Sequence, residues 1–177
     1  CQESDGGQAF VVTTLERALD LPQPPAIIAA AAQGSAEDQQ MMKSYYRDEI
    51  TDIPEMGLCA RQLWRDTGLG PSDIQTAILY DHFTPLVLPQ LEEFGFCARG
   101  EAADFIRDGN IEIGGRLPIN TNGGQLGEAY IHGMNGIAEG VRQIRGDSVN
   151  PVPGAQNVLV TAGTAVPTSA LILSGSH

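Results

Sequence analysis

The chain has 177 residues, enough for one domain with a hydrophobic core, and its 42% hydrophobic and 18% charged residues are typical of a globular protein. Its 22 acidic and 10 basic residues give a net charge of −12, which argues against binding to a nucleic-acid phosphate backbone. No apolar run reaches the length of a membrane span, so neither a nucleic-acid nor a membrane partner is expected. Three unevenly spaced cysteines favour free thiols in a reducing cytoplasm over a disulfide framework or a metal site.

The first predicted elements are two apolar segments separated by a short helix. Residues 8–14 are rich in β-branched and aromatic side chains and predict a strand of a buried sheet. Residues 15–19 predict a short helical turn that prolines then end. The continuous apolar run 26–32 predicts a central strand buried on both faces, although its alanine content leaves a helix open.

A polar segment follows over residues 33–53, and it is expected to be a loop with at most a helical turn. Met41 and Tyr45 lie in its middle. A methionine adapts its shape and a tyrosine offers a flat face, so both are candidates for lining an apolar ligand channel. The alternative is that they cover the edge of the core.

The remainder of the chain alternates between helical periodicity and short apolar strands. Helices are predicted over 54–64, 85–94, 100–109 and 127–144, and strands over 75–80, 156–161 and 170–173.

Tyr80, Asp81 and His82 form a chemical cluster at the end of the predicted strand 75–80. Open α/β folds usually place their sites where strands end. Such a cluster taken alone is structural about as often as it is catalytic.

A second cluster occupies residues 120–136, which contain five glycines and three asparagines together with Tyr130 and His132. Glycines let a backbone turn sharply and approach a ligand closely, and a polar loop before a helix offers unpaired N–H groups. A tight loop followed by a packed helix is the alternative interpretation.

The second cluster resembles the active-site loop of thiolases, in particular the sterol-carrier and lipid-transfer branch. The family pattern Asn-Pro-Ser-Gly-Gly, then Gly-His-Pro-Leu-Gly-Ala-Thr-Gly, matches this chain at Asn120, Gly123, Gly124, Gly133 and Gly136. The catalytic histidine of the family is replaced here by Tyr130. The first cluster resembles the family string His-Asp-Cys-Phe-Thr-Pro, with Tyr80 and His82 in the places of histidine and cysteine. The turn 162–168, where a Claisen-active thiolase carries Cys-x-Gly, contains no cysteine.

The resemblance implies an α/β fold, the C-terminal half of a thiolase-like protein with a mixed five-stranded sheet covered by helices. The segment Ser-Asp-Gly near the N-terminus resembles one near the middle of a full thiolase. Residues 1–20 are therefore expected to end the N-terminal half with its last strand, and residues 21–177 to form the C-terminal thiolase-like domain.

The resemblance also implies an activity, because lipid-transfer thiolases without the thiolase catalytic set resemble the aldolases of bacterial steroid side-chain degradation. These cleave a 17-hydroxy steroid acyl-CoA into a 17-keto steroid and propionyl-CoA. Tyr80 and Tyr130 are the expected acid–base pair, with their roles unassigned. His132, Asp81 and His82 are second choices for orienting or tuning them.

Other expectations concern ligands and partners. Asn120 and the Gly123 and Gly124 amides are candidates for holding the thioester oxygen. A homodimer and an OB-fold, zinc-ribbon partner protein are expected by resemblance, and no cofactor is expected beyond the CoA of the substrate.

Two alternatives remain open at the level of sequence. A catalytically inactive thiolase-fold subunit that binds acyl-CoA or scaffolds a partner would also lack the catalytic histidine and cysteine. A true thiolase or acyltransferase with its nucleophile elsewhere is less favoured, because acyl transfer needs its base in place.

Overall fold

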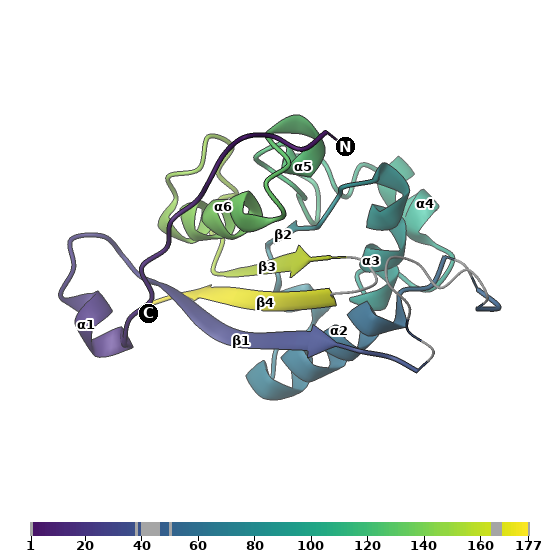
Figure 1. Cartoon of the computed structure of the whole chain (residues 1–177), viewed down its shortest axis with the longest axis horizontal. Coiled ribbons are helices and arrows are strands. Elements are labelled where there is room, and N and C mark those ends of the chain that lie inside the picture. The colour runs from purple at the N-terminus through teal and green to yellow at the C-terminus, as the bar shows by residue number, and fades with distance from the viewer. Residues whose placement is uncertain (1, 38, 40–46, 50, 164–167, 177) are drawn as a thin grey trace.

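The computed structural model describes residues 2–37, 39, 47–49, 51–163 and 168–176 (Figure 1). Its helices are α1 (Leu15–Leu19), α2 (Pro54–Thr67), α3 (Val87–Glu93), α4 (Ala102–Arg107), α5 (Gly124–Gly127) and α6 (Met134–Arg145). Its strands are β1 (Ala26–Gly34), β2 (Thr76–Ile78), β3 (Asn157–Ala162) and β4 (Thr168–Gly175). Two 3₁₀ turns, Pro71–Asp73 and Thr84–Leu86, precede β2 and α3.

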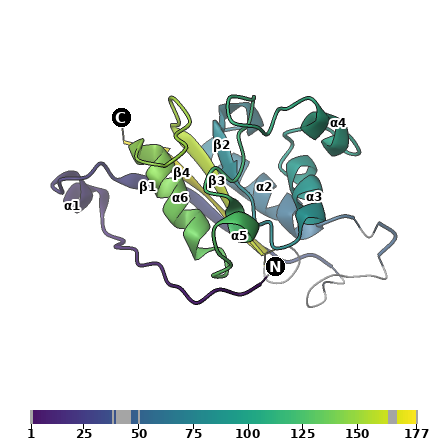
Figure 2. The ribbon, with the colours of Figure 1, turned by 90° about the horizontal axis from the view of Figure 1, so that it is seen from above.

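The strands form one mixed sheet in the order β1-β4-β3-β2. β4 pairs antiparallel with both β1 and β3, whereas β2 pairs parallel with β3. Helix α2 covers one face of the sheet and α6 the other, which the views from the front and from above both show (Figures 1 and 2).

Two apolar clusters hold these layers together. The larger one, on the α2 side, includes Met56, Leu63, Phe94 and Ile172, each fully buried. The smaller one lies between α6 and the sheet and is built from Ile78, Ala155, Val158, Val160 and Leu173. α6 comes close to the sheet because Gly140 has no side chain: a Cβ there would be 2.9 Å from the side chains of Leu173 and Val160.

Several predicted elements are confirmed with small shifts of their ends. The helix beginning at Pro54 continues to Thr67 and ends at Gly68, which has a left-handed φ of 71°. The short helix 15–19 and the strands corresponding to β2, β3 and β4 are also present, as are α3 and α4. The α/β class and the mixed sheet are confirmed.

Three predictions about the sheet are wrong. Residues 8–14 form no strand, and Val11 and Val12 are 91% and 77% exposed. β1 is an edge strand in which only Ala32 and Gly34 are buried, instead of a central strand buried on both faces. Apolar composition alone does not reveal which strands lie beside it. The described sheet has four strands, not five: only an isolated bridge between Ala77 and Ile119 continues it beyond β2.

The predicted helix 127–144 is confirmed only in its C-terminal part, because residues 128–133 form a loop. α5 ends at Gly127, and α6 begins at Met134. His132 and Gly133 between them have φ values of 57° and 84°, and left-handed residues interrupt an α-helix. Tyr130 and His132 consequently lie in a loop and not on a helix.

Within the described part of the chain, no helix is both long and apolar enough to cross a membrane.

Candidate active site

The end of β2 positions the first tyrosine through its backbone. The Tyr80 N–H donates to Thr161 Oγ1 on β3 at 2.8 Å, and the Tyr80 carbonyl accepts from Gln90 Nε2 on α3 at 2.8 Å. Thr161 Oγ1 in turn donates to Gln90 Oε1 at 2.7 Å, which closes a buried three-residue network. The Tyr80 side chain is 7% exposed. This residue is therefore fixed from two neighbouring elements.

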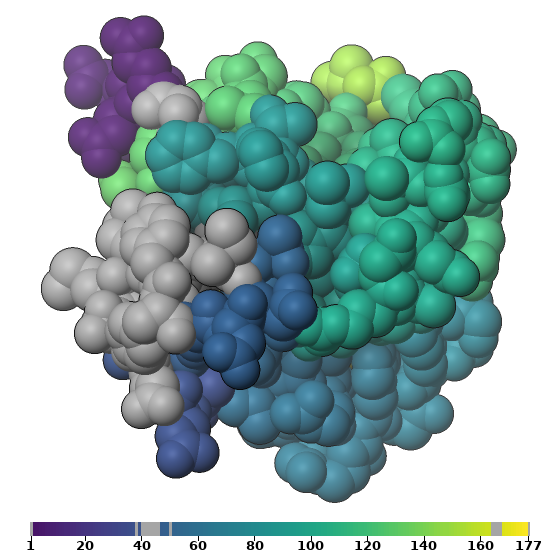
Figure 3. All heavy atoms as spheres, turned by 90° about the vertical axis from the view of Figure 1, so that its right-hand side faces the viewer, coloured from purple at the N-terminus to yellow at the C-terminus, as the bar shows by residue number. Residues whose placement is uncertain are grey.

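The loop 128–133 brings the second tyrosine to the first. The Tyr80 hydroxyl donates to the Tyr130 hydroxyl oxygen at 3.1 Å, and the two rings meet edge-on with centroids 6.2 Å apart. The N-terminal segment also binds this loop, because the Ser4 backbone N–H donates to the Tyr130 carbonyl oxygen at 3.0 Å. Figure 3 shows the N-terminal residues beside the green residues of this region.

Two histidine rings extend the tyrosine pair on either side. The His82 ring lies 5.0 Å from the Tyr80 ring, and the His132 ring lies 4.8 Å from the Tyr130 ring. His132 is exposed, and its Nε2 is 3.3 Å from Glu3 Oε1. The structure thus gathers Tyr80, Tyr130, His82 and His132 into one aromatic cluster.

Burial changes the acid–base properties of this cluster. Burial, followed by the hydrogen bond with Tyr130, raises the pKa of the Tyr80 phenol well above its ordinary value. Partial burial lowers the pKa of the His82 imidazole. At pH 7, Tyr80 is therefore a neutral hydrogen-bond donor and His82 a neutral imidazole.

The Asp81 carboxylate bonds to the backbone of α5. The residue is 7% exposed, and its Oδ1 accepts the backbone N–H of Gln125 at 2.6 Å. The carboxylate packs against Gly124, where a Cβ would collide with it. Its observed contacts are those of an anchor for the loop.

The groups expected to hold a thioester oxygen already take part in hydrogen bonds within the protein. Asn120 Oδ1 accepts from Leu79 N at 2.7 Å, which ties this loop to the end of β2. The Gly123 N–H donates to Asn120 O at 2.7 Å, and the Gly124 N–H donates to Asn122 Oδ1 at 3.1 Å. This geometry does not support an oxyanion site at these two amides, because their hydrogens already have acceptors.

Sequence reasoning missed three buried polar residues that hold the site. These are Gln90 and Thr161 behind Tyr80 and Gln125 beneath the Tyr130 loop. Nothing in their sequence context separates them from ordinary helix and strand residues. Met41 and Tyr45 lie outside the described residues, and in the described ranges no group of three or more His, Cys, Asp or Glu side chains is placed to hold a metal ion.

A family model described as thiolase C-terminal domain-like matches residues 34–175. The chain belongs to the thiolase family. Over all 177 of its residues it is 75% identical to a steroid side-chain-cleaving aldolase of Thermomonospora curvata, of which it covers 45%. Over 173 residues, or 98% of the chain, it is 70% identical to the 17-hydroxy-3-oxo-4-pregnene-20-carboxyl-CoA lyase of Mycobacterium tuberculosis, again covering 45% of that protein.

A solved structure agrees with these relatives. The Ltp2-ChsH2(DUF35) aldolase superposes on this thiolase-family chain with a TM-score of 0.97 at 74% identity, over 99% of the chain and 46% of that structure's chain. The chain therefore spans less than half the length of the relatives that it matches.

Proposed function

We propose that this chain carries the acid–base pair of an aldolase that cleaves the side chain of a steroid acyl-CoA. The observation that carries the proposal is the 3.1 Å hydrogen bond between Tyr80 and Tyr130, two phenols at positions where thiolases resembling this chain hold histidines. The two relatives at 75% and 70% identity are named for side-chain cleavage of a steroid and for lysis of a steroid carboxyl-CoA. The substrate we propose is a 17-hydroxy steroid C22 acyl-CoA, and the products are a 17-keto steroid and propionyl-CoA.

A retro-aldol cleavage needs one group that accepts the proton of the β-hydroxyl and one that protonates the departing enolate. We assign the first role to Tyr130 as a phenolate. A hydrogen bond from Tyr80 stabilises negative charge on the Tyr130 oxygen, and Tyr80 itself stays protonated because burial raises its pKa. The second role falls to Tyr80.

The proposed steps balance in protons and electrons. The Tyr130 phenolate takes the hydroxyl proton, the C–O oxygen becomes the ketone, and the Cα–Cβ bond breaks with its electron pair entering the thioester enolate. The Tyr80 hydroxyl protonates the enolate carbon. Proton transfer from Tyr130 back to Tyr80 along their direct hydrogen bond restores the starting state.

We also propose the partners of the full-length enzyme. The solved relative is named the Ltp2-ChsH2(DUF35) aldolase, and this double name supports a partner protein, expected by family resemblance to be an OB-fold, zinc-ribbon domain. A homodimer, a cytoplasmic location and the absence of any cofactor other than the substrate's CoA complete the proposal.

The test uses the full-length protein with its partner and a 17-hydroxy steroid acyl-CoA with a three-carbon side chain. We expect propionyl-CoA and the 17-keto steroid to appear together by mass spectrometry. Tyr80→Phe and Tyr130→Phe remove only a hydroxyl, and each should lower kcat by about 10²- to 10⁴-fold, which is the usual contribution of general acid–base catalysis.

Near-normal turnover in both Tyr80→Phe and Tyr130→Phe would refute the assignment. Acyl-CoA binding without cleavage by the wild-type protein would favour a non-catalytic subunit, and acyl transfer between CoA esters would favour a thiolase.

A further inference from the structure

The segments that carry the two tyrosines are joined by one buried residue, through its backbone N–H on one side and its side chain on the other. Gln125 of α5 is 5% exposed and contacts both segments that carry the tyrosines. We propose that Gln125 is a positioning residue that sets the distance between the Tyr80 and Tyr130 hydroxyls. This inference rests on the proposed function, in which these hydroxyls exchange protons.

The first half of this connection joins Gln125 to the end of β2. Its backbone N–H donates to Asp81 Oδ1 at 2.6 Å, and Asp81 is the residue after Tyr80. Hydrogen bonds to a carboxylate are among the stronger ones in proteins. α5 has only four residues, and so short a helix depends on tertiary contacts of this kind.

The second half joins Gln125 to the loop of Tyr130. Gln125 Oε1 accepts the backbone N–H of Gly133 at 3.2 Å. Gly133 lies directly on the Tyr80 ring, where a Cβ would be 2.9 Å from Cε2. One side chain therefore holds the C-terminal end of the loop against the same tyrosine whose hydroxyl meets Tyr130.

A second buried amide holds the other end of the loop without reaching β2. Asn135 Nδ2 donates to Ala129 O at 2.9 Å and to Glu128 Oε2 at 2.8 Å. Asn135 thus fixes the shape of the loop, whereas Gln125 fixes its location relative to Tyr80. Small displacements of reacting groups, on the order of 1 Å, can cost about 10²-fold in rate.

The test compares Gln125→Met with Gln125→Glu in the full-length complex. Methionine is similar in length but offers no oxygen to Gly133, whereas glutamate keeps an acceptor there. We expect Gln125→Met to lower kcat by about 10- to 100-fold with little change in KM, since it misplaces the hydroxyls without touching the substrate. Gln125→Glu should keep a clearly higher kcat than Gln125→Met.

A double-mutant cycle separates positioning from general loss of stability. In a Tyr130→Phe background, Gln125→Met should change kcat less than about 2-fold, because the pair it positions no longer exists. The matched control is Gln143→Met, which removes another buried glutamine, one that bonds to Thr121, Glu139, Asn150 and Val152. Its effect on kcat should simply multiply with that of Tyr130→Phe.

A readout that does not need turnover keeps this inference separate from the proposed function. Amide hydrogen exchange at Gly133 should speed up by at least about 10-fold in Gln125→Met and much less in Gln143→Met. Unchanged Gly133 protection, or a Gln125→Met effect that multiplies fully with Tyr130→Phe, would overturn the proposal. If the wild-type protein cleaves no steroid thioester while Gly133 behaves as expected, the function is wrong and the positioning of the loop by Gln125 stands.

Discussion

Tyr80 and Tyr130 differ in their burial and in the contacts that hold them, although both are tyrosines. Tyr80 follows a sheet strand, is 7% exposed and has both backbone polar groups bonded to buried side chains. Tyr130 lies in a loop, is partly exposed and is held mainly through its neighbours. The asymmetry suits a reaction in which Tyr80 begins as the proton donor and Tyr130 as the proton acceptor.

Gly133 is the residue whose missing side chain matters most to this pair. In Gly133→Ala, a left-handed φ of 84° and a Cβ only 2.9 Å from the Tyr80 ring act together. Backbone strain of about 1 kcal/mol and overpacking of about 1–3 kcal/mol should lower the free energy of unfolding by about 2–4 kcal/mol, measured by urea denaturation.

Gly146→Ala is the matched control for this change. Gly146 has a similar φ of 73°, but no atom lies within 4 Å of the place a Cβ would occupy. It should lose only the strain, about 1 kcal/mol. Equal losses in the two variants would show that contact with Tyr80 does not contribute.

The sequence was sufficient to find the tyrosines but not what holds them. Tyr80 and Tyr130 stand in motifs whose spacing survives the change of residue type, so they could be located without a structure. Gln125 bonds to Asp81, 44 residues away, and Thr161 bonds to Tyr80 across 81 residues. Such contacts have no local pattern, because they arise only when the strands and loops are assembled.

Helix α6 joins the two loops behind the site through a buried carboxylate. Glu139, 2% exposed, accepts from Gln143 Nε2 at 2.9 Å and Ser148 Oγ at 2.7 Å, and also from Thr121 Oγ1. Thr121 follows Asn120, which bonds to the end of β2. A buried acceptor therefore links α6 to the loops 120–123 and 147–150.

Removing the Glu139 carboxylate should lower the free energy of unfolding, because it joins α6 to two loops. Glu139→Ala leaves the buried hydroxyls of Thr121 and Ser148 without their acceptor, whereas Gln143 Nε2 keeps its other acceptors. Unsatisfied buried groups cost about 1–3 kcal/mol each before the site relaxes. We expect a total loss of about 3 kcal/mol in the free energy of unfolding, measured by urea denaturation. Glu139→Gln keeps one acceptor oxygen and should lose less than half as much. A larger loss in Glu139→Gln would instead show that the negative charge is what matters.

Helices and strands were predicted correctly where local residues determine them. The predictions failed where packing against other parts of the chain determines the backbone conformation. The start of α2 at Pro54 was predicted correctly, because proline favours the first turn of a helix. The helix continues three residues beyond the predicted end and stops at Gly68, which takes the left-handed conformation that glycine favours. The apolar pattern from Ile131 to Ile144 suggested one helix, yet His132 and Gly133 take left-handed conformations that the tertiary contacts of the Tyr130 loop impose. The edge location of β1 depends on pairing with β4 alone, which composition does not encode.

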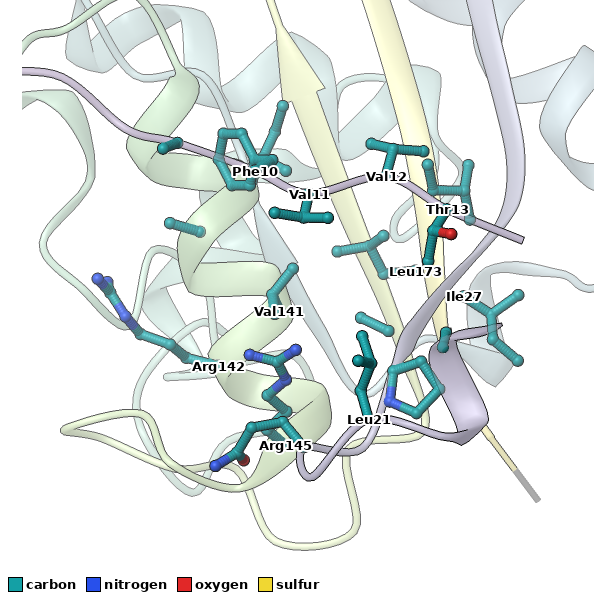
Figure 4. Close-up of a pocket in the computed structure, with 18 of the residues that line it drawn as sticks. Phe10, Val11, Val12, Thr13, Leu21, Ile27, Val141, Arg142, Arg145 and Leu173 are labelled. Carbon is teal, nitrogen blue, oxygen red and sulfur yellow. The ribbon is translucent and has the colours of Figure 1, made fainter. Parts of the chain in front are cut away.

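At the scale of the whole molecule, a broad, largely apolar cavity of about 820 Å³ lies between the N-terminal segment, α6 and the sheet. Figure 4 shows Phe10, Val11 and Val12 of the N-terminal segment facing Val141 of α6 and Leu173 of β4 across it. Val11 and Val12 make little use of these neighbours, because they are 91% and 77% exposed. The segment 8–14 was predicted as a strand from the same residues that now line this cavity.

The isolated 177-residue chain should therefore bind the apolar dye ANS, which reports exposed hydrophobic surface. The double variant Val11→Thr, Val12→Thr keeps the β-branched shape but lowers the apolar area, so it should reduce ANS fluorescence. Its melting temperature should stay within about 2 °C of the original, since exposed substitutions rarely change stability much.

The matched control is Val158→Thr with Val160→Thr, at residues 0% and 2% exposed in the core beneath α6. Burying two hydroxyls there should cost about 1–3 kcal/mol each. An equal loss of stability in both pairs would contradict the exposed placement of residues 8–14, because it would mean that these valines are packed as firmly as the core.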